Sequence, residues 1–132
     1  MRAEHLYKRF GDKPVLEDVS LTVPAGAVLC LMAPSGWGKT TLLRCLNFLE
    51  TPDKGVISVR GEKLFDAAEH ASRSESDIRK KRLHFGLVFQ SFNLFNNMSV
   101  LKNCMTGQMK VLHRGRAESE EKALFYLEKV GM

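Results

Sequence analysis

Residues 33–40 read Ala33-Pro34-Ser35-Gly36-Trp37-Gly38-Lys39-Thr40, and the segments on either side give this run its meaning. An apolar run at 27–32 precedes it and is expected to form a buried strand. The residues that follow, 41–49, carry leucines at helical spacing. A strand, a loop of small residues, Gly-Lys-Thr and a helix in this order predict a phosphate-binding P-loop.

The residue types in this loop suit a phosphate ligand. Backbone N–H groups of the loop can surround the phosphate oxygens, and the start of the following helix adds partial positive charge. Gly36 and Gly38 let the backbone approach closely because they have no Cβ. Lys39 brings a positive charge to the β- and γ-phosphates, and the Thr40 hydroxyl is placed to bind Mg²⁺. The candidate nucleotide-binding residues of the loop are Ser35, Gly36, Trp37, Gly38, Lys39, Thr40 and Thr41.

Two positions depart from the common form of such a loop. Ala33 stands where the pattern begins with glycine, and its methyl group is harmless if φ is negative there. Trp37 is bulky, but only its backbone N–H is needed, so its ring is expected to point outward. The alternative is a glycine-rich turn without a ligand, and the agreement of strand, loop and helix weighs against it.

Composition limits the classes of protein to consider. A chain of 132 residues with 44% hydrophobic residues is one domain or part of one. The net charge is +5, but basic residues cluster only at 79–82 and without interleaved aromatic residues, so nucleic acid is not an expected partner. The three cysteines, Cys30, Cys45 and Cys104, lack metal or redox spacing and are expected to be reduced and buried.

No apolar run approaches the ~20 residues that span a bilayer. The first residues also lack the apolar region of a signal peptide. Any role at a membrane is therefore expected to pass through a partner.

The rest of the chain reads as short strands followed by helices. Strands are expected at 2–8, 15–23, 56–61 and 85–89, a polar surface loop at 66–76, and helices at 77–82, from Ser99 to Leu112, and after Gly115. The close spacing of the first strands predicts a small antiparallel sheet beside the nucleotide site. The loop at 91–98 is unusually apolar.

From about Leu6 onward, the sequence resembles the ATP-binding subunit of an ABC transporter. The resemblance is carried by Lys8-Arg9-Phe10-Gly11, by 34–44 and by Val88-Phe89-Gln90, and the runs 43–50 and 89–95 most resemble subunits of bacterial polar amino-acid importers. It implies an α/β fold, a P-loop NTPase core of the ABC ATPase type with a small antiparallel β subdomain. Residues 1–90 would be the N-terminal part of the nucleotide-binding domain, and 91–132 the start of its helical subdomain.

The resemblance also assigns roles by position. Phe10 corresponds to the aromatic residue that stacks on adenine, and a core phenylalanine at a strand end is the alternative. Gln90 corresponds to the glutamine-loop residue that reaches Mg²⁺ or the attacking water, and a strand-end glutamine bonded to backbone is the alternative. Lys39 and Gln90 are thus the catalytic candidates, and Thr40 and Gln90 the metal candidates. Phe92, Leu94 and Phe95 either line a groove for a helix of the membrane subunit or pack internally.

The resemblance implies ATP and Mg²⁺ as ligands and a peripheral location at the cytoplasmic face of the cell membrane. The implied partners are transmembrane permease subunits, a second copy in a nucleotide-sandwich dimer and, indirectly, an extracytoplasmic solute-binding protein. The sequence contains no Leu-Ser-Gly-Gly-Gln signature, no apolar strand ending in Asp-Glu and no switch histidine. We therefore expect a domain truncated before the signature motif, which alone binds ATP and hydrolyses it negligibly.

Other P-loop proteins fit less well. A GTPase needs Asn-Lys-x-Asp to recognise guanine, and the sequence has no such motif. A small-molecule kinase should carry an Arg-rich lid, whereas the tail here is acidic and leucine-rich. Two alternatives stay open: a non-hydrolysing nucleotide-binding fragment of a truncated gene, and a P-loop ATPase that acts outside transport.

Overall fold

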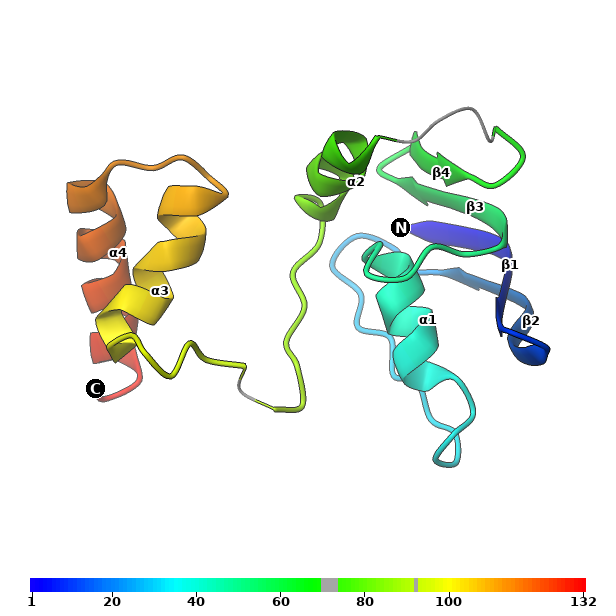
Figure 1. Cartoon of the computed structure of the whole chain (residues 1–132), viewed down its shortest axis with the longest axis horizontal. Coiled ribbons are helices and arrows are strands. Elements are labelled where there is room, and N and C mark those ends of the chain that lie inside the picture. Colours follow the sequence, from blue (N-terminus) through cyan, green and yellow to red (C-terminus); the bar gives the residue numbers. More distant parts are fainter. Residues whose placement is uncertain (70–73, 92) are drawn as a thin grey trace. The chain divides into compact units, whose positions relative to one another are not determined.

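The chain forms two compact units, Met1–Leu87 and Val88–Met132, and the computed structural model describes residues 1–69, 74–91 and 93–132. The first unit contains β1 (Arg2–Phe10), β2 (Lys13–Thr22), α1 (Lys39–Leu46), β3 (Lys54–Val59), β4 (Glu62–Asp66) and α2 (Glu75–Arg82) (Figure 1). The second contains α3 (Val100–Lys110) and α4 (Arg116–Lys129). A functional division at residue 90 stays a prediction.

The four strands form one sheet in the order β2-β1-β3-β4, and every neighbouring pair is antiparallel. This confirms the small antiparallel sheet. The turn between β3 and β4 has positive φ at both central residues, 53° at Arg60 and 84° at Gly61, as the right-handed twist of a two-residue hairpin favours. The sequence did not lead us to predict β4, although the Arg60-Gly61 pair is its signal.

Helix α1 packs on one face of this sheet. Its buried residues Leu42, Cys45 and Leu46 join one hydrophobic core with Leu6 of β1 and Ile57 of β3. Each large apolar side chain in such a core stabilises the fold by about 1.5–3 kcal/mol relative to exposure. The same core holds the helix that follows the P-loop against the sheet.

Two expected strands do not form. Residues 27–32 and 85–89 have no regular structure, and Val28 and Val88 are both 97% exposed. A strand needs a neighbour to satisfy its backbone N–H and C=O groups. In the described part of the chain the strand pairings are those among β1 to β4, so these two apolar runs have no ladder to join. Their hydrophobicity alone does not make them strands.

The second unit is a pair of helices whose starts match the sequence signals. The Ser99 hydroxyl caps α3 by accepting from the Lys102 N–H at 3.3 Å, and Gly115 precedes α4. Met105 of α3 and Ala123 of α4 are buried. Both expected helices are confirmed.

The cysteines differ from the prediction in two of three cases. Cys45 is buried in the core, and that burial raises the pKa of its thiol to about 11. Cys30 and Cys104 are exposed, Cys30 because the expected buried strand around it does not form.

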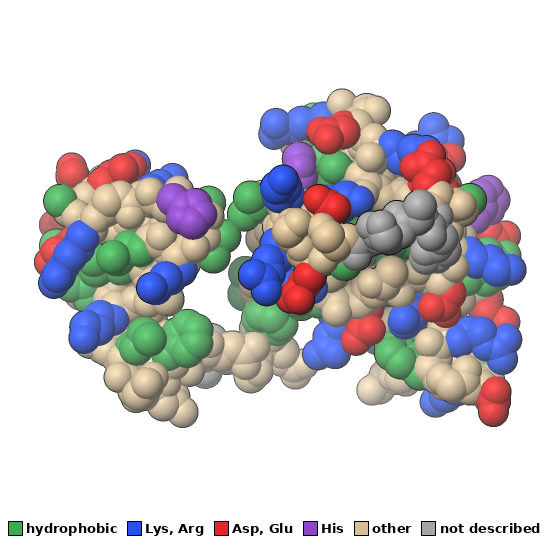
Figure 2. All heavy atoms as spheres, turned by 45° about the horizontal axis from the view of Figure 1, so that its top comes forward, with side chains coloured by type: hydrophobic (Ala, Val, Ile, Leu, Met, Phe, Trp, Pro, Cys, Tyr) green, Lys and Arg blue, Asp and Glu red, His purple; other side chains and the backbone are tan. Residues whose placement is uncertain are grey.

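The surface shown in Figure 2 mixes Lys and Arg with Asp and Glu side chains instead of separating them into regions of one sign. No helix in the described ranges is both long enough and apolar enough to cross a membrane. The prediction that nucleic acid is not a partner stays untested.

Candidate phosphate-binding site

The loop before α1 has the backbone geometry that its glycines allow. Gly36 and Gly38 have φ of 84° and 81°, in the left-handed region where a Cβ is unfavourable. Trp37 lies between them with its side chain 73% exposed, which confirms that the ring points outward. The backbone at Ala33 avoids the left-handed region, so the condition for tolerating its methyl group is met.

The N-terminal end of α1 is chemically open to an anion. Gly38 is its N-cap and supplies no side-chain hydrogen bond, and the first turn contains no acidic residue. Unpaired N–H groups and the positive end of the helix dipole therefore remain available. Thr40 is exposed in this first turn, and Thr41 is half-buried beside it. This donor set fits a phosphate group, and the exposed Thr40 hydroxyl fits a hard cation bound to that phosphate.

Lys39 folds back over the loop. Its Nζ donates to the carbonyl oxygens of Ala33 and Pro34, at 2.5 and 2.7 Å. Both acceptors are neutral, so the ammonium charge is not compensated by a carboxylate in these contacts. The lysine is thus held over the loop with its charge available to a phosphate.

Two features of the structure favour glycine at position 38: the left-handed backbone and the close approach of β2. A Cβ at this position would lie 2.8 Å from the Val15 carbonyl oxygen and 3.2 Å from side-chain carbons of Val15 and Leu16. The P-loop therefore presses directly against β2. By contrast, a Cβ on Gly36 would meet nothing within 4 Å.

Phe10, the predicted adenine-stacking residue, ends β1 with its ring 47% exposed. The Nζ of Lys8 lies 5.2 Å from the centre of that ring. An exposed ring at a strand end is available for stacking, which fits the functional alternative better than a core role.

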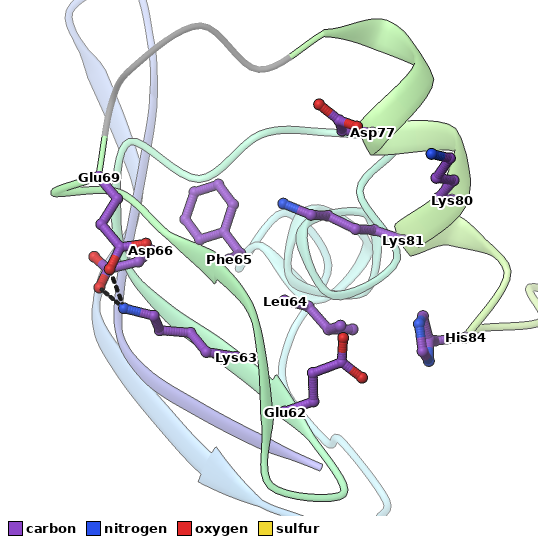
Figure 3. A pocket seen from close by; sticks show the side chains of 10 residues that line it. All are labelled: Glu62, Lys63, Leu64, Phe65, Asp66, Glu69, Asp77, Lys80, Lys81 and His84. Atoms are coloured by element: carbon purple, nitrogen blue, oxygen red, sulfur yellow. Dashed lines mark hydrogen bonds and ion pairs between the residues drawn. The ribbon is translucent and has the colours of Figure 1, made fainter.

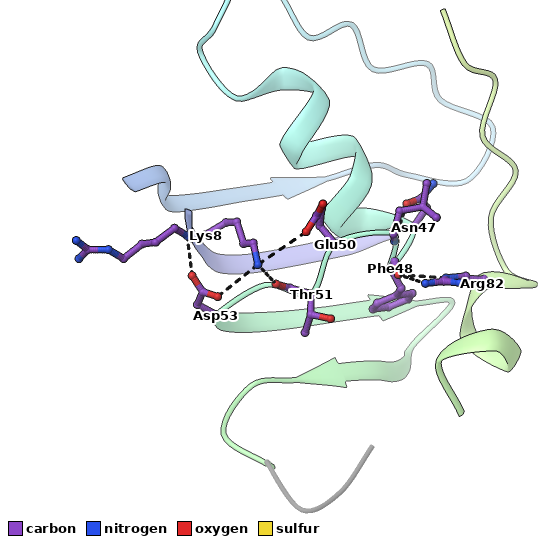
Figure 4. A network of polar contacts seen from close by, with 9 residues as sticks. Lys8, Asn47, Phe48, Glu50, Thr51, Asp53 and Arg82 are labelled. Carbon is purple, nitrogen blue, oxygen red and sulfur yellow. Dashed lines mark hydrogen bonds and ion pairs between the residues drawn. The ribbon is translucent and has the colours of Figure 1, made fainter. Parts of the chain in front are cut away.

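Lys8 links the end of β1 to the segment after α1 (Figure 4). Its Nζ donates to the Thr51 carbonyl oxygen at 2.8 Å and lies 3.6 Å from an oxygen of Asp53. The backbone N–H of Arg9 donates to the other Asp53 oxygen at 2.6 Å. These contacts fix the strand end that carries Phe10. This role of Lys8 was not predicted from the sequence, because its partners Thr51 and Asp53 lie far from it along the chain.

Gln90 is exposed and belongs to the second unit, so its part in the site stays a prediction. Of the three apolar residues expected in the loop after it, Leu94 and Phe95 are exposed, and Phe92 lies outside the described residues.

Asn103 of α3 forms hydrogen bonds to the loop that precedes this helix. Its side chain accepts from the Phe95 N–H at 2.8 Å and donates to the Phe95 and Met98 carbonyl oxygens, both at 3.2 Å.

A separate cavity of about 420 Å³ lies between β4 and α2, and none of its lining residues belongs to the P-loop (Figure 3). Its walls carry both charges. Lys63 bonds to Asp66 at 3.0 Å and to Glu69, and these hydrogen bonds raise the pKa of Lys63. The mixed charge does not point to one class of ligand.

The chain is similar to known proteins over most of its length. The family model described as ABC transporter matches residues 16–132. The nopaline permease ATP-binding protein P of Agrobacterium fabrum is 43% identical over 98% of this chain and 52% of that protein. The glutamine transport ATP-binding protein GlnQ of Geobacillus stearothermophilus is 43% identical over 95% of this chain and 49% of that protein. The histidine/lysine/arginine/ornithine transport ATP-binding protein HisP of Escherichia coli is 40% identical over 96% of this chain and 51% of that protein.

The fold has a solved counterpart. The dimeric, post-hydrolysis structure of the ATP-binding cassette MJ0796 with ADP and Pi matches with a TM-score of 0.79 and 25% identity, over 96% of this chain and 55% of that one. The chain spans about half the length of the curated relatives it matches.

Proposed function

Since the chain belongs to the ABC transporter family, we propose that it is the MgATP-binding part of the ATP-binding subunit of an importer for a polar amino acid. The observation that carries this proposal is the loop of residues 33–40, with left-handed glycines, an uncapped helix start and a lysine held over it. The relatives named for nopaline, glutamine and histidine transport support the class of solute.

Each residue then has a defined task. The backbone N–H groups from Ser35 to Thr41 bind the phosphates, and Lys39 turns its ammonium group from the loop carbonyls to the β- and γ-phosphates. The Thr40 hydroxyl binds Mg²⁺, which neutralises phosphate charge. Phe10 stacks on the adenine, and Gln90 completes the metal and water contacts.

The partners follow from the family. ATP-binding subunits of ABC transporters work with membrane permease subunits, so we place the chain at the cytoplasmic face of the membrane, in contact with such a permease through the apolar loop at 91–98. The dimeric state of MJ0796 supports a second copy as partner, with MgATP between the two. A solute-binding protein on the other side of the membrane would act indirectly. Because the sequence lacks the signature, the Asp-Glu strand and the switch histidine, we expect this chain alone to bind ATP with negligible turnover.

Trp37 offers a direct test, because it is the only tryptophan and lies in the loop. Titration of the chain with MgATP should give a saturable change in Trp37 fluorescence. Lys39→Ala should remove it, whereas Lys110→Ala, at an exposed position of α3, should leave it unchanged. A wild-type chain with no saturable change and no thermal stabilisation by millimolar MgATP would refute the proposal.

The role of Phe10 can be separated from that of the loop by its ligand. Stacking on a base contributes about 1–3 kcal/mol, so Phe10→Ala should weaken ATP binding about 5- to 150-fold. Binding of inorganic tripolyphosphate, which has no base, should not change. Equal losses for both ligands would show that Phe10 supports the loop instead of contacting adenine.

A further inference from the structure

Lys8 is a lysine whose charged group is largely withdrawn from solvent. Its side chain is only 13% exposed, and a lysine is rarely buried unless its charge is paired. Besides its bond to the Thr51 carbonyl oxygen, Nζ lies 3.6 Å from an oxygen of Asp53 and 4.0 Å from an oxygen of Glu50. Figure 4 shows Nζ between these three acceptors. One carbonyl group and two carboxylates therefore hold the ammonium group in place.

The acceptors of this ammonium group are themselves anchored. The Glu50 backbone N–H donates to the carbonyl oxygen of Arg44, a residue of α1, at 3.0 Å. The Asp53 carboxylate accepts from the N–H of Arg9, the residue directly before Phe10, at 2.6 Å. These contacts join the backbone beside Phe10 to α1, the helix that begins at the P-loop.

Lys8 also contacts the ring of Phe10. Its Nζ lies over this ring, 5.2 Å from the centre, which is within the range of a cation–π interaction. The ring is still half exposed, so the lysine leaves part of it open to a base. Because the ammonium group is fixed by its acceptors, its contact with the ring restricts where the ring can lie.

The sheet brings these contacts close to the P-loop. Lys8 pairs with Leu16 in the ladder between β1 and β2. A Cβ on Gly38 would lie 3.2 Å from a side-chain carbon of Leu16, so the P-loop packs on the same pair of strands. Phe10 is two residues beyond Lys8, about 7 Å along the strand. The ring and the loop thus lie at the same end of the β1–β2 pair, within the first unit.

We propose that Lys8 is a positioning residue for the base of the bound nucleotide: together with Asp53, it holds the Phe10 ring in the orientation that stacks on adenine. The inference rests on the proposed MgATP function, in which Phe10 contacts the base and the loop of residues 33–40 contacts the phosphates. It requires Lys8 to act on binding of the base through Phe10, and not on binding of the phosphates or on the fold alone.

The test uses two variants of the full chain that disrupt these contacts. Lys8→Met keeps a long apolar side chain but removes the ammonium group. Asp53→Ala removes an acceptor of both Lys8 and the Arg9 N–H, and it does so at an exposed residue, without deleting a buried group. Lys54→Met is the matched control, because the Lys54 Nζ lies over a different ring of β1, that of Tyr7, at 5.6 Å.

Affinity is measured from Trp37 fluorescence for MgATP and for magnesium tripolyphosphate, which has no base. Lys8→Met and Asp53→Ala should each weaken MgATP binding about 2- to 30-fold, as expected for a lost cation–π contact and its coupled partner, and should leave tripolyphosphate binding unchanged. Lys54→Met should bind both ligands as wild type does. In a Phe10→Ala background, Lys8→Met should cause no further loss of MgATP affinity, because the ring that it positions is gone.

The outcomes separate the two hypotheses. A wild-type chain that does not bind MgATP overturns the proposed function and this inference with it. If wild type binds MgATP and both Lys8→Met and Asp53→Ala bind it equally well, the inference alone is overturned. If Lys8→Met does not fold, Asp53→Ala decides the question with the same two ligands.

Two further results would also overturn the inference. Equal losses of affinity for MgATP and tripolyphosphate would show that Lys8 supports the loop or the fold instead of the base. A full loss from Lys8→Met in the Phe10→Ala background would show that the two residues act independently.

Discussion

Replacing Gly38 with alanine tests whether the P-loop is pressed against β2 as the structure shows. The substitution has two costs. A non-glycine residue in the left-handed region loses about 1–2 kcal/mol. The new Cβ would also lie 2.8 Å from the Val15 carbonyl oxygen, so the loop or the strand must move. Overpacking of this kind costs about 1–3 kcal/mol more.

Gly36→Ala is the matched control, because Gly36 has nearly the same φ and open space where its Cβ would be. Gly36→Ala therefore has the cost of a left-handed backbone but not the cost of a Cβ that overlaps a neighbour. Replacing glycine with alanine also lowers the conformational entropy of the unfolded chain, which favours folding, but this effect is common to both variants and cancels in their difference. We therefore expect Gly38→Ala to lower the free energy of unfolding by about 1–3 kcal/mol more than Gly36→Ala.

The assay is urea unfolding followed by far-UV circular dichroism. Trp37 fluorescence is unsuitable for this purpose, because a side chain that is 73% exposed in the folded state changes environment little on unfolding. Equal free energies of unfolding for the two variants would refute the close approach of the loop to β2, and would leave φ as the only reason for glycine at position 38.

Three further predictions concern other parts of the chain. Burial raises the pKa of Cys45 from 9.0 to about 11, so the unfolded thiol ionises first; stability is fully present below pH 9 and falls between pH 9 and 11. Unfolding free energies of Cys45→Ala should lack that part of the pH dependence, and identical profiles for both proteins would contradict the assignment. Asn103→Ala should speed proteolysis at 94–98, whereas Lys102→Ala, on the exposed side of α3, should not; unchanged cleavage would mean that the Asn103 bonds do not hold the loop. Ala33→Gly should leave the MgATP affinity within about twofold of wild type, since Ala33 is outside the left-handed region; much tighter binding by the glycine variant would show that the methyl group obstructs the loop.

Local signals in the sequence were sufficient for much of the site. The small residues and the Lys-Thr pair at 36–40 predict a loop and a helix start, because glycine permits left-handed backbone and an uncapped helix end attracts phosphate. Ser99 and Gly115 predict helix starts in the same way. Each of these signals concerns a residue and its near neighbours in the chain, and the structure places all of them as expected.

Contacts between distant segments were not readable from the sequence. The bond from Arg82 to Phe48 joins residues 34 positions apart, and that from Lys8 to Thr51 joins residues 43 apart. Both use backbone carbonyl groups as acceptors, which every residue has. No residue type or spacing therefore marks these contacts in advance.

The sequence by itself predicted a loop at residues 33–40, the helix that follows it and a small antiparallel sheet, and the structure contains all three, while phosphate binding by the loop stays a proposal. Tertiary structure alone decided which apolar runs become strands. Residues 27–32 and 85–89 are as hydrophobic as a buried strand requires, yet they stay irregular. The physical reason is that a strand is stabilised by hydrogen bonds to a neighbour, and hydrophobicity specifies burial without supplying that neighbour.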